Sequence, residues 1–141
     1  MTSNKQLIEN DYQKGLKSEI KFNEILNTFF NNKFKMTSRY NIFDYITYDG
    51  NIYVEFKERF VYSNTYKSTM VGINKVNVAC TIILNGLKVY FFFKFIDCIK
   101  YYEFIEYDKS YIGNGGRVDR NKNEMKENGY YYIPNEKLKL L

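Results

Sequence analysis

No histidine is present among the 141 residues, and this absence removes whole classes of mechanism. Imidazole is the usual general base near neutral pH. The sequence therefore excludes Ser-His and Cys-His hydrolases and nucleases that bind their metal through histidine. Carboxylates, lysine and metal-bound water remain as the groups for acid–base chemistry.

Cysteine is also scarce. Cys80 and Cys98 have neither a Cys-x-x-Cys partner nor a histidine neighbour, so we expect no zinc site. They are predicted to be reduced, buried thiols of a cytosolic protein. No stretch approaches the roughly 18–20 apolar residues that span a bilayer, and no signal-peptide pattern is present. We expect no membrane partner and a cytoplasmic location, in a bacterial cell or a phage-infected host.

The length of the chain predicts its number of domains, and its charge indicates the kind of partner that it binds. We expect residues 1–141 to form one domain, large enough to bury a core without disulfides. The net charge of +5 and the pI of about 9.0 favour a polyanionic partner such as nucleic acid.

A β-hairpin is predicted in the first half of the chain. Residues 42–48 and 51–57 are rich in β-branched and aromatic side chains, and Asp49-Gly50 between them is a strong two-residue turn signal. Counting back from this turn places Asp44 directly opposite Glu55.

The alternation of side chains divides the hairpin into two faces. One face is predicted to be core-like and holds Phe43, Tyr45, Thr47, Ile52, Val54 and Phe56. The other face holds the charges, with Asp44, Ile46, Tyr53, Glu55 and Lys57. Opposed carboxylates repel unless a cation lies between them or they share one proton, and a bound metal ion is the simpler explanation. With Gly50-Asn51 as the turn instead, Asp44 faces Lys57 in an ordinary ion pair, and the hairpin alone leaves both interpretations open.

A helix is predicted before the hairpin, over residues 12–30. Its apolar residues recur at helical spacing and form one stripe of Tyr12, Leu16, Ile20, Leu26 and Phe30. Glu19 lies within this stripe, and a buried carboxylate must be paired, protonated or bound to metal. We expect Glu19 to point toward the hairpin face that holds the other two acids. The alternative is a bond to Arg39 or Lys57 inside the core.

A helix with Glu19, followed by a hairpin with Asp44 and Glu55-Phe56-Lys57, resembles the core of the PD-(D/E)xK nucleases. The resemblance spans roughly residues 15–95 and departs from the family pattern at Phe43, which replaces the proline. It implies an α/β fold, a restriction-endonuclease-like core in which helices flank a mixed central β-sheet in the order αβββαβ.

The resemblance implies a metal-dependent deoxyribonuclease that leaves a 5′-phosphate. Glu19, Asp44, Glu55 and Lys57 are the predicted catalytic residues. Asp44, Glu55 and the backbone carbonyl of Phe56 are predicted to hold Mg²⁺, with Mn²⁺ as the substitute, and Glu19 to act through a bound water. The small size and residues 115–134 are similar to phage or archaeal junction-resolvase-like members, which implies branched DNA or Holliday junctions as partners and leaves a homodimer open.

The second half of the chain is predicted to continue the core. Ser68 or Thr69 is expected to cap a helix that runs to about Leu84 and turns Gly72, Val76, Ala79 and Ile83 toward the sheet. Asn85-Gly86 either ends this helix or turns a hairpin. Residues 87–96 predict a buried strand, 99–107 a more exposed partner, 110–128 a loop and 130–133 a short final strand.

Four basic residues are predicted to bind nucleic acid: Lys67, Lys75, Arg117 and Arg120. Lys75 matches a place where related nucleases carry a supporting lysine, and its alternative is a solvent-exposed lysine. The two arginines suit phosphate because their planar donors bind two oxygens, although Asp119 and Glu124 could pair with them instead.

Two other functional classes stay open from the sequence. One is a nucleic-acid-binding protein without catalysis, whose acids are structural. The other is a protein-interaction module that uses the tyrosine-rich surface. The clustered acids oppose the first class, because carboxylates beside a phosphate backbone repel it unless a cation intervenes.

Overall fold

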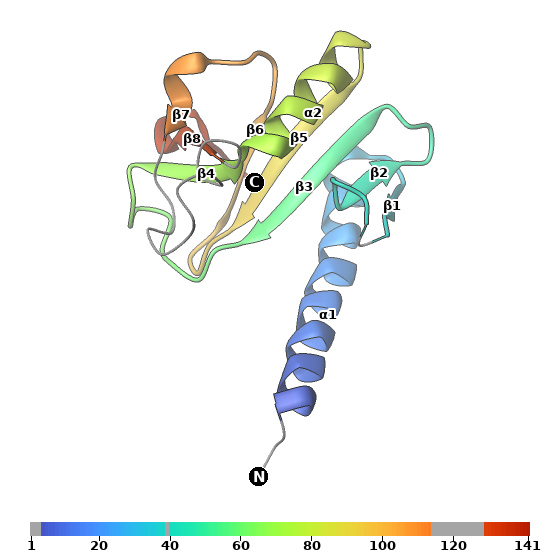
Figure 1. Cartoon of the computed structure of the whole chain (residues 1–141). Coiled ribbons are helices and arrows are strands. Elements are labelled where there is room, and N and C mark those ends of the chain that lie inside the picture. The colour runs from blue at the N-terminus through green and yellow to red at the C-terminus, as the bar shows by residue number, and fades with distance from the viewer. Residues whose placement is uncertain (1–3, 39, 114–128) are drawn as a thin grey trace.

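Two β-sheets and two α-helices make up the part of the chain that the computed structural model describes, residues 4–38, 40–113 and 129–141 (Figure 1). The larger sheet has the strand order β1 (Phe34–Met36), β2 (Tyr45–Thr47), β3 (Ile52–Glu58), β5 (Lys88–Lys94), β6 (Ile99–Glu103) and β9 (Lys139–Leu140). The pair β3 and β5 is parallel and the other pairs are antiparallel, so the sheet is mixed.

The smaller sheet lies against the larger one and has the order β4 (Ser68–Gly72), β8 (Tyr130–Pro134) and β7 (Ile112–Gly113). The helices are α1 (Asn4–Phe30) and α2 (Ile73–Leu84), with short 3₁₀ turns η1 (Lys109–Tyr111) and η2 (Asn135–Lys137). A helix, three strands of one sheet, a helix and a further strand of that sheet follow one another, which confirms the predicted restriction-endonuclease-like core. Strand β4 is an addition to the predicted order.

The hairpin between β2 and β3 has the predicted register. Tyr45 pairs with Val54, and Ile46 pairs with Tyr53. Gly50 adopts a positive φ of 76°, which glycine tolerates without a steric penalty. The Oγ1 of Thr47 accepts hydrogen bonds from the backbone N–H groups of Asn51 and Ile52, both at 3.1 Å, and closes the turn. The alternative turn at Gly50-Asn51 is therefore wrong.

The two faces of the hairpin lie in two separate cores. Tyr45, Val54 and Phe56 pack under α1, while Tyr53 packs with α2 on the opposite face. Phe43 does not follow the predicted alternation: it lies in the α2 core, with its ring centroid 6.0 Å from that of Tyr53. The reason is that β2 begins only at Tyr45, so strand geometry does not orient Phe43.

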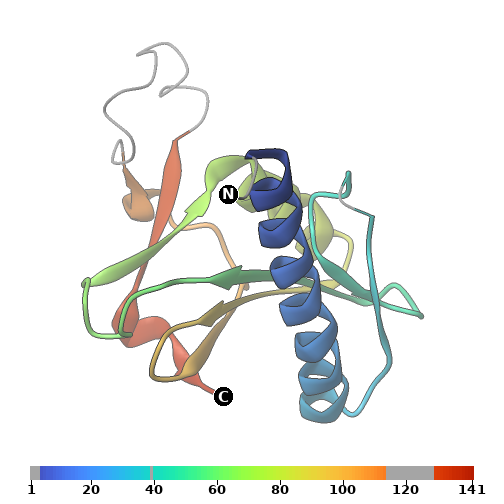
Figure 2. The same ribbon diagram turned by 90° about the horizontal axis from the view of Figure 1, so that it is seen from below.

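Helix α1 is longer than predicted and packs through Phe22 and Leu26. The ring of Phe22 stacks on that of Phe56, with a centroid distance of 4.0 Å. Within the predicted stripe, Tyr12 and Ile20 are about half exposed. The N-terminal part of α1 extends past the sheet, as Figures 1 and 2 show, so regular helical spacing there does not produce burial. Ile20 is exposed for another reason, because it lies about 200° around the helix from the buried Phe22.

Helix α2 begins at Ile73, later than predicted. The residues expected to cap it, Ser68 and Thr69, belong to strand β4 instead, because Thr69 and its neighbours pair with β8. Val76 and Ala79 are buried as expected, but Ile82 takes the place predicted for Ile83. Asn85-Gly86 ends the helix, with Gly86 at φ 79°.

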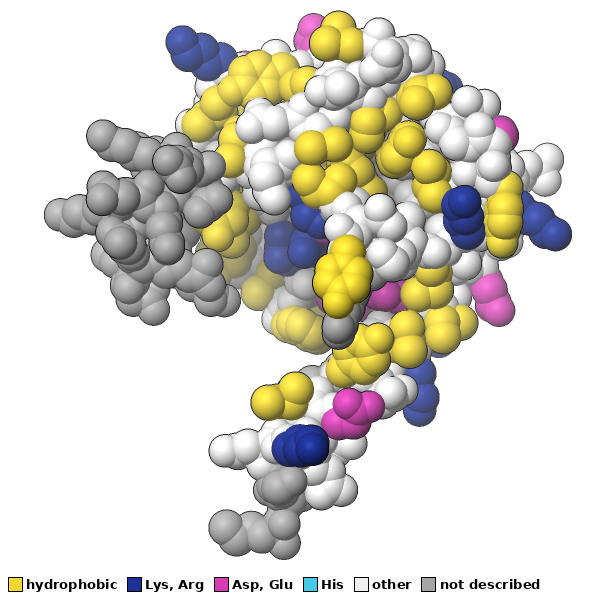
Figure 3. Space-filling view, turned by 45° about the vertical axis from the view of Figure 1, so that its right-hand side comes forward, with side chains coloured by type: hydrophobic (Ala, Val, Ile, Leu, Met, Phe, Trp, Pro, Cys, Tyr) yellow, Lys and Arg dark blue, Asp and Glu magenta, His cyan; other side chains and the backbone are white. Residues whose placement is uncertain are grey.

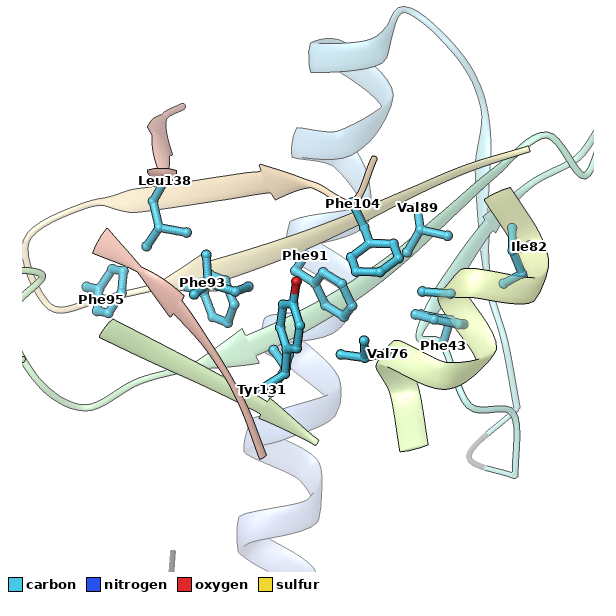
Figure 4. Packing of buried hydrophobic residues seen from close by; sticks show 13 residues of the cluster. Phe43, Val76, Ile82, Val89, Phe91, Phe93, Phe95, Phe104, Tyr131 and Leu138 are labelled. Carbon is cyan, nitrogen blue, oxygen red and sulfur yellow. The ribbon is translucent and has the colours of Figure 1, made fainter. Parts of the chain in front are cut away.

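The core on the α2 side joins the two sheets. Figure 4 shows Phe91, Phe104 and Tyr131 packed together with Val76 beside them. Strand β5 has the predicted buried character, with all five central residues buried, and β6 is its partly exposed partner. The segment predicted as the last strand, 130–133, forms β8 in the smaller sheet, and β9 follows it. Cys80 and Cys98 are free thiols and only partly buried.

Candidate active site

Asp44 and Glu55 meet where β2 begins beside the middle of β3. The Oδ2 of Asp44 accepts a hydrogen bond of 2.8 Å from the backbone N–H of Phe56. This bond fixes the Asp44 carboxylate next to Glu55, which is the neighbour of Phe56 in β3. The side chain of Glu55 is 1% exposed, so a group that is normally charged is held inside the protein.

Lys75 of α2 supplies the main counter-charge to Glu55. Its Nζ lies 2.7 Å from Oε1 of Glu55 and donates a second bond of 2.7 Å to the backbone carbonyl of Ile42. The alternative of a freely solvated lysine is therefore wrong. The first turn of α2 aims this side chain at β3, so Lys75 belongs to the carboxylate cluster.

Lys57 lies on the same face of β3, two residues after Glu55. Its Nζ is 3.5 Å from Oε1 of Glu55, and its side chain is 43% exposed. The ammonium of Lys57 is thus both near the carboxylates and open to a molecule from solvent. Figure 3 shows basic and acidic side chains together in a recess above the protruding helix.

Glu19 belongs to helix α1, which packs on the face of the sheet opposite Glu55. The charges of Asp44 and Lys57 act on the Glu19 carboxylate, and Lys57 lies on the same face of β3 as Glu55. The expectation that Glu19 points toward the face of the other two acids stays a prediction. The Oη of Tyr45 donates a hydrogen bond to the backbone carbonyl of Glu19 and anchors this turn of α1. Asp44 precedes the first residue of β2, so both faces can approach it.

The electrostatics of the cluster favour a bound cation. Burial, together with the charge of Asp44, raises the pKa of Glu55 to about 7, although Lys75 and Lys57 oppose the shift. Burial and the charge of Asp44 also raise the pKa of Glu19, against the effect of Lys57. Asp44 thus repels both glutamates, and a cation beside it would relieve this repulsion.

The donor set fits a small, oxygen-preferring ion. The Oε2 of Glu55 is buried and has no hydrogen-bond partner among the described residues. Buried carboxylate oxygens are rarely left without a partner, and Mg²⁺ accepts such oxygens while it keeps several waters. Groups of three or more acids or cysteines close enough to hold an ion are absent from the described parts of the chain. Asp44 and Glu55 can each offer a carboxylate to the ion, and Phe56 can offer its backbone carbonyl. Glu19 is not needed as a direct ligand.

Comparison with known families decides the identity of the fold. The model of a family described as phage putative PDDEXK endonuclease matches residues 9–139. The chain belongs to this phage endonuclease family. The predicted resemblance to the PD-(D/E)xK nucleases is thereby confirmed. The curated proteins and the solved structures contain no match to the chain.

The residues predicted to bind nucleic acid are distributed unevenly in the structure. Lys67 is exposed in the loop before β4. Lys75 lies in the carboxylate cluster, as described above. Arg117 and Arg120 fall outside the described residues, and so does Arg39. No helix in the parts described is long and apolar enough to cross a membrane.

Two residues near the site were missed from the sequence. Arg59 continues the alternation of Glu55 and Lys57 and is partly buried, with its Nη2 2.7 Å from the backbone carbonyl of Met70. Ser18 of α1 donates a hydrogen bond to Glu58 and adds a second link between the helix and β3. The two-residue period of β3 could have identified Arg59, whereas the pairing of Ser18 with Glu58 has no sequence signal.

Proposed function

We propose that this chain is a Mg²⁺-dependent endonuclease that hydrolyses phosphodiester bonds in DNA. Membership of the phage endonuclease family supports nuclease activity. The observation that carries the metal dependence is the Glu55 carboxylate. It is 1% exposed and has a pKa raised to about 7, and its Oε2 has no partner among the described residues. A cation at this oxygen would explain why the chain buries it.

Asp44, Glu55 and the backbone carbonyl of Phe56 would hold the ion. Bound Mg²⁺ would act as a Lewis acid toward the phosphate and lower the pKa of an attacking water; Mn²⁺ would supply the same chemistry. Lys75 favours the ionised form of Glu55 through its 2.7 Å contact and so opposes the rise of its pKa. Without that ammonium, burial would favour the protonated, non-binding form.

Lys57 would orient the attacking water and offset the negative charge that develops on the phosphate. Its ammonium is half exposed and close to Glu55, which suits a group that must meet substrate. Glu19 would position a water beside Asp44, because the charges of Asp44 and Lys57 both act on its carboxylate. These roles follow from position and charge, since no histidine is available as a base.

The substrate backbone would be held by basic residues around the site. Lys67 is exposed in the loop before β4, and Arg117 and Arg120 are further candidates by sequence. The positive net charge agrees with a polyanionic partner. Branched DNA as the preferred substrate, a homodimer and a cytoplasmic location in the host remain predictions.

The test compares labelled junction, flap, duplex and single-stranded DNA, and matching RNA, with Mg²⁺ and with EDTA. Cleavage of DNA that requires Mg²⁺ and disappears in Glu55→Gln is the expected result. Binding without cleavage of any of these molecules, under any metal condition, would identify a non-catalytic nucleic-acid-binding protein. Cleavage that persists in EDTA would contradict the metal-dependent mechanism.

A further inference from the structure

A second feature lies beside the carboxylate cluster: a pocket of about 360 Å³ at the end of β3. This volume is within the range of pockets that hold small molecules, about 300–1,000 Å³. The loop of residues 59–67 and strand β4 form its walls, and Tyr132 of β8 also lines it. The roles proposed above for the carboxylates and lysines leave this pocket unused.

The walls of the pocket are held in place by specific bonds. Ser63 donates from its backbone N–H and from its hydroxyl to the two carboxylate oxygens of Asp97, at 2.8 and 2.6 Å. The side-chain amide of Asn135 donates to the carbonyls of Ser63 and Tyr66 and accepts from the hydroxyl of Thr69. These bonds tie the second half of the loop to Asp97 and Asn135 and so fix one wall of the pocket.

Aromatic side chains at the mouth of this pocket are open to solvent. Phe60 is 83% exposed, Tyr66 is 67% exposed and Tyr62 is 57% exposed. Three exposed aromatic rings within one short loop are unusual for a protein surface unless they meet a partner. Flat apolar rings suit a flat apolar ligand, and nucleobases stack on such rings whatever their sequence.

Arg59 connects the pocket to the proposed catalytic cluster. Its backbone N–H bonds to the carbonyl of Lys94 at 2.9 Å, so the β3 ladder continues to this residue and its side chain lies on the face of Glu55 and Lys57. At about 3.3 Å per strand residue, its Cα lies about 7 Å from that of Lys57. Arg59 also lines the pocket. Burial lowers the pKa of its guanidinium, and the negative charge of Glu55 opposes this shift. A nucleotide next to one held at the cluster can therefore reach the pocket.

We infer that this pocket binds one unpaired base of the nucleic acid, next to the phosphate that is cleaved, by stacking on Phe60 and Tyr66. A base inside a duplex must first be unstacked and unpaired before it can enter, and this free-energy cost is least for a base that is already unpaired. The preferred substrate is then a strand with an unpaired nucleotide near the cleaved bond, as at a flap, bulge or branch. This inference rests on the proposed function, because it takes the carboxylate cluster as the place of cleavage.

A binding experiment in EDTA tests the inference without cleavage. Short single-stranded oligonucleotides carry one abasic site, moved along the strand in turn, and their affinities are compared with that of the intact strand. At one position the abasic site should weaken binding to the wild-type protein by about five- to hundredfold, the loss expected when one stacked base is removed. Phe60→Ala with Tyr66→Ala should weaken binding of the intact strand by a similar factor.

The decisive result is the combination of both changes. If the missing base is the one that stacks on these rings, the double-alanine variant should bind the abasic and intact strands equally, because the interaction is already lost. Tyr48→Ala is the matched control: Tyr48 is 68% exposed, like Tyr66, but lies at the far turn of the hairpin. It should retain the full abasic effect.

Losses that simply add in the combined experiment would overturn the inference, and so would a variant that binds the intact strand as tightly as the wild type. Cleavage in Mg²⁺ with additive losses would refute the base pocket and leave the nuclease function standing. Coupled losses without any cleavage would keep the base pocket and refute the nuclease. Circular dichroism of each variant confirms that the fold is retained.

Discussion

The ammonium of Lys75 lies 2.7 Å from Oε1 of Glu55 and joins helix α2 to the middle strand of the sheet. The same Nζ also binds the backbone carbonyl of Ile42, just before the segment that leads to Asp44. Lys75 thus offsets the charge of the buried Glu55 and also holds the backbone segment that leads to Asp44. A buried pair of this kind contributes less to stability than to the state and position of the carboxylate.

The first prediction concerns the variant Lys75→Met. Loss of the ammonium leaves burial and the Asp44 charge acting on Glu55, so the pKa of Glu55 should rise above about 7. Each further unit lowers the ionised fraction at neutral pH, and with it the apparent Mg²⁺ affinity, by about tenfold. Calorimetry measures the loss of Mg²⁺ affinity at neutral pH and its recovery at alkaline pH, where Glu55 ionises. Lys88→Met, at an exposed lysine of β5, is the control and should bind Mg²⁺ as the wild type does. Unchanged Mg²⁺ affinity in Lys75→Met would reject the proposed effect of Lys75 on Glu55.

Lys57→Ala should behave differently from Lys75→Met. Protonated lysine cannot ligate Mg²⁺, and Lys57 is the more exposed of the two lysines near Glu55. We expect metal affinity to stay nearly unchanged while turnover falls by about 10²–10³-fold, as when one stabilising positive group is removed from a transition state. Calorimetry and single-turnover kinetics separate these effects. Loss of metal binding would instead make Lys57 a clamp for the acids.

Asp44→Asn and Glu55→Gln should each abolish cleavage while DNA binding is kept or becomes tighter. Each change removes a proposed metal ligand and one negative charge that faces the phosphates. Gel-shift and cleavage assays on the same DNA measure both quantities. Glu106→Gln changes an exposed acid outside the cluster and should leave both quantities unaltered. Near wild-type cleavage by Asp44→Asn would remove Asp44 from the metal site.

Glu19→Gln should lower the cleavage rate less than loss of Asp44 does. Glu19 is near Asp44 but comes from helix α1, which packs on the opposite face of the sheet from Glu55, and this suits action through a water. In metal-free protein the variant should melt at the same or a higher temperature, because the repulsion from Asp44 is relieved. A marked drop in melting temperature with full activity would indicate a purely structural carboxylate.

The parts of the fold that followed from the sequence were those with strong local signals. Asp49-Gly50 determined the hairpin register, and that register placed Asp44 beside Glu55. The run of aromatic residues in β5 indicated a strand buried on both faces. In each case the local sequence pattern and the tertiary packing favour the same structure, so the pattern alone was sufficient to predict the element.

Other features depend on contacts between distant segments. Ser68 and Thr69 have the chemistry of helix caps, but pairing with β8, more than sixty residues later, makes them part of a strand. Ile20 has helical spacing, but α1 packs on the sheet through Phe22 and Leu26. Ile20 lies about 200° around the helix from Phe22 and is half exposed. The contact of Lys75 with Glu55 also joins two elements whose relative placement no local pattern specifies.

The last prediction is a pH dependence of stability that comes from Glu55. Its pKa is about 7 in the folded protein against an ordinary value of 4.5, so between these values the folded state binds more protons than the unfolded state. Its contribution is fully present below about pH 4.5 and is lost as the pH rises through about 7. The shift corresponds to at most about 3 kcal/mol in the free energy of unfolding.

Urea unfolding in EDTA across this pH range measures the effect against Glu55→Gln, which cannot titrate at this position. The wild type should lose stability relative to the variant as the pH rises. Added Mg²⁺ should reverse the trend for the wild type alone, because an ion that binds only the folded, ionised form stabilises it most at high pH. Parallel stability curves for the two proteins, with and without Mg²⁺, would show that Glu55 neither titrates in this range nor holds the ion.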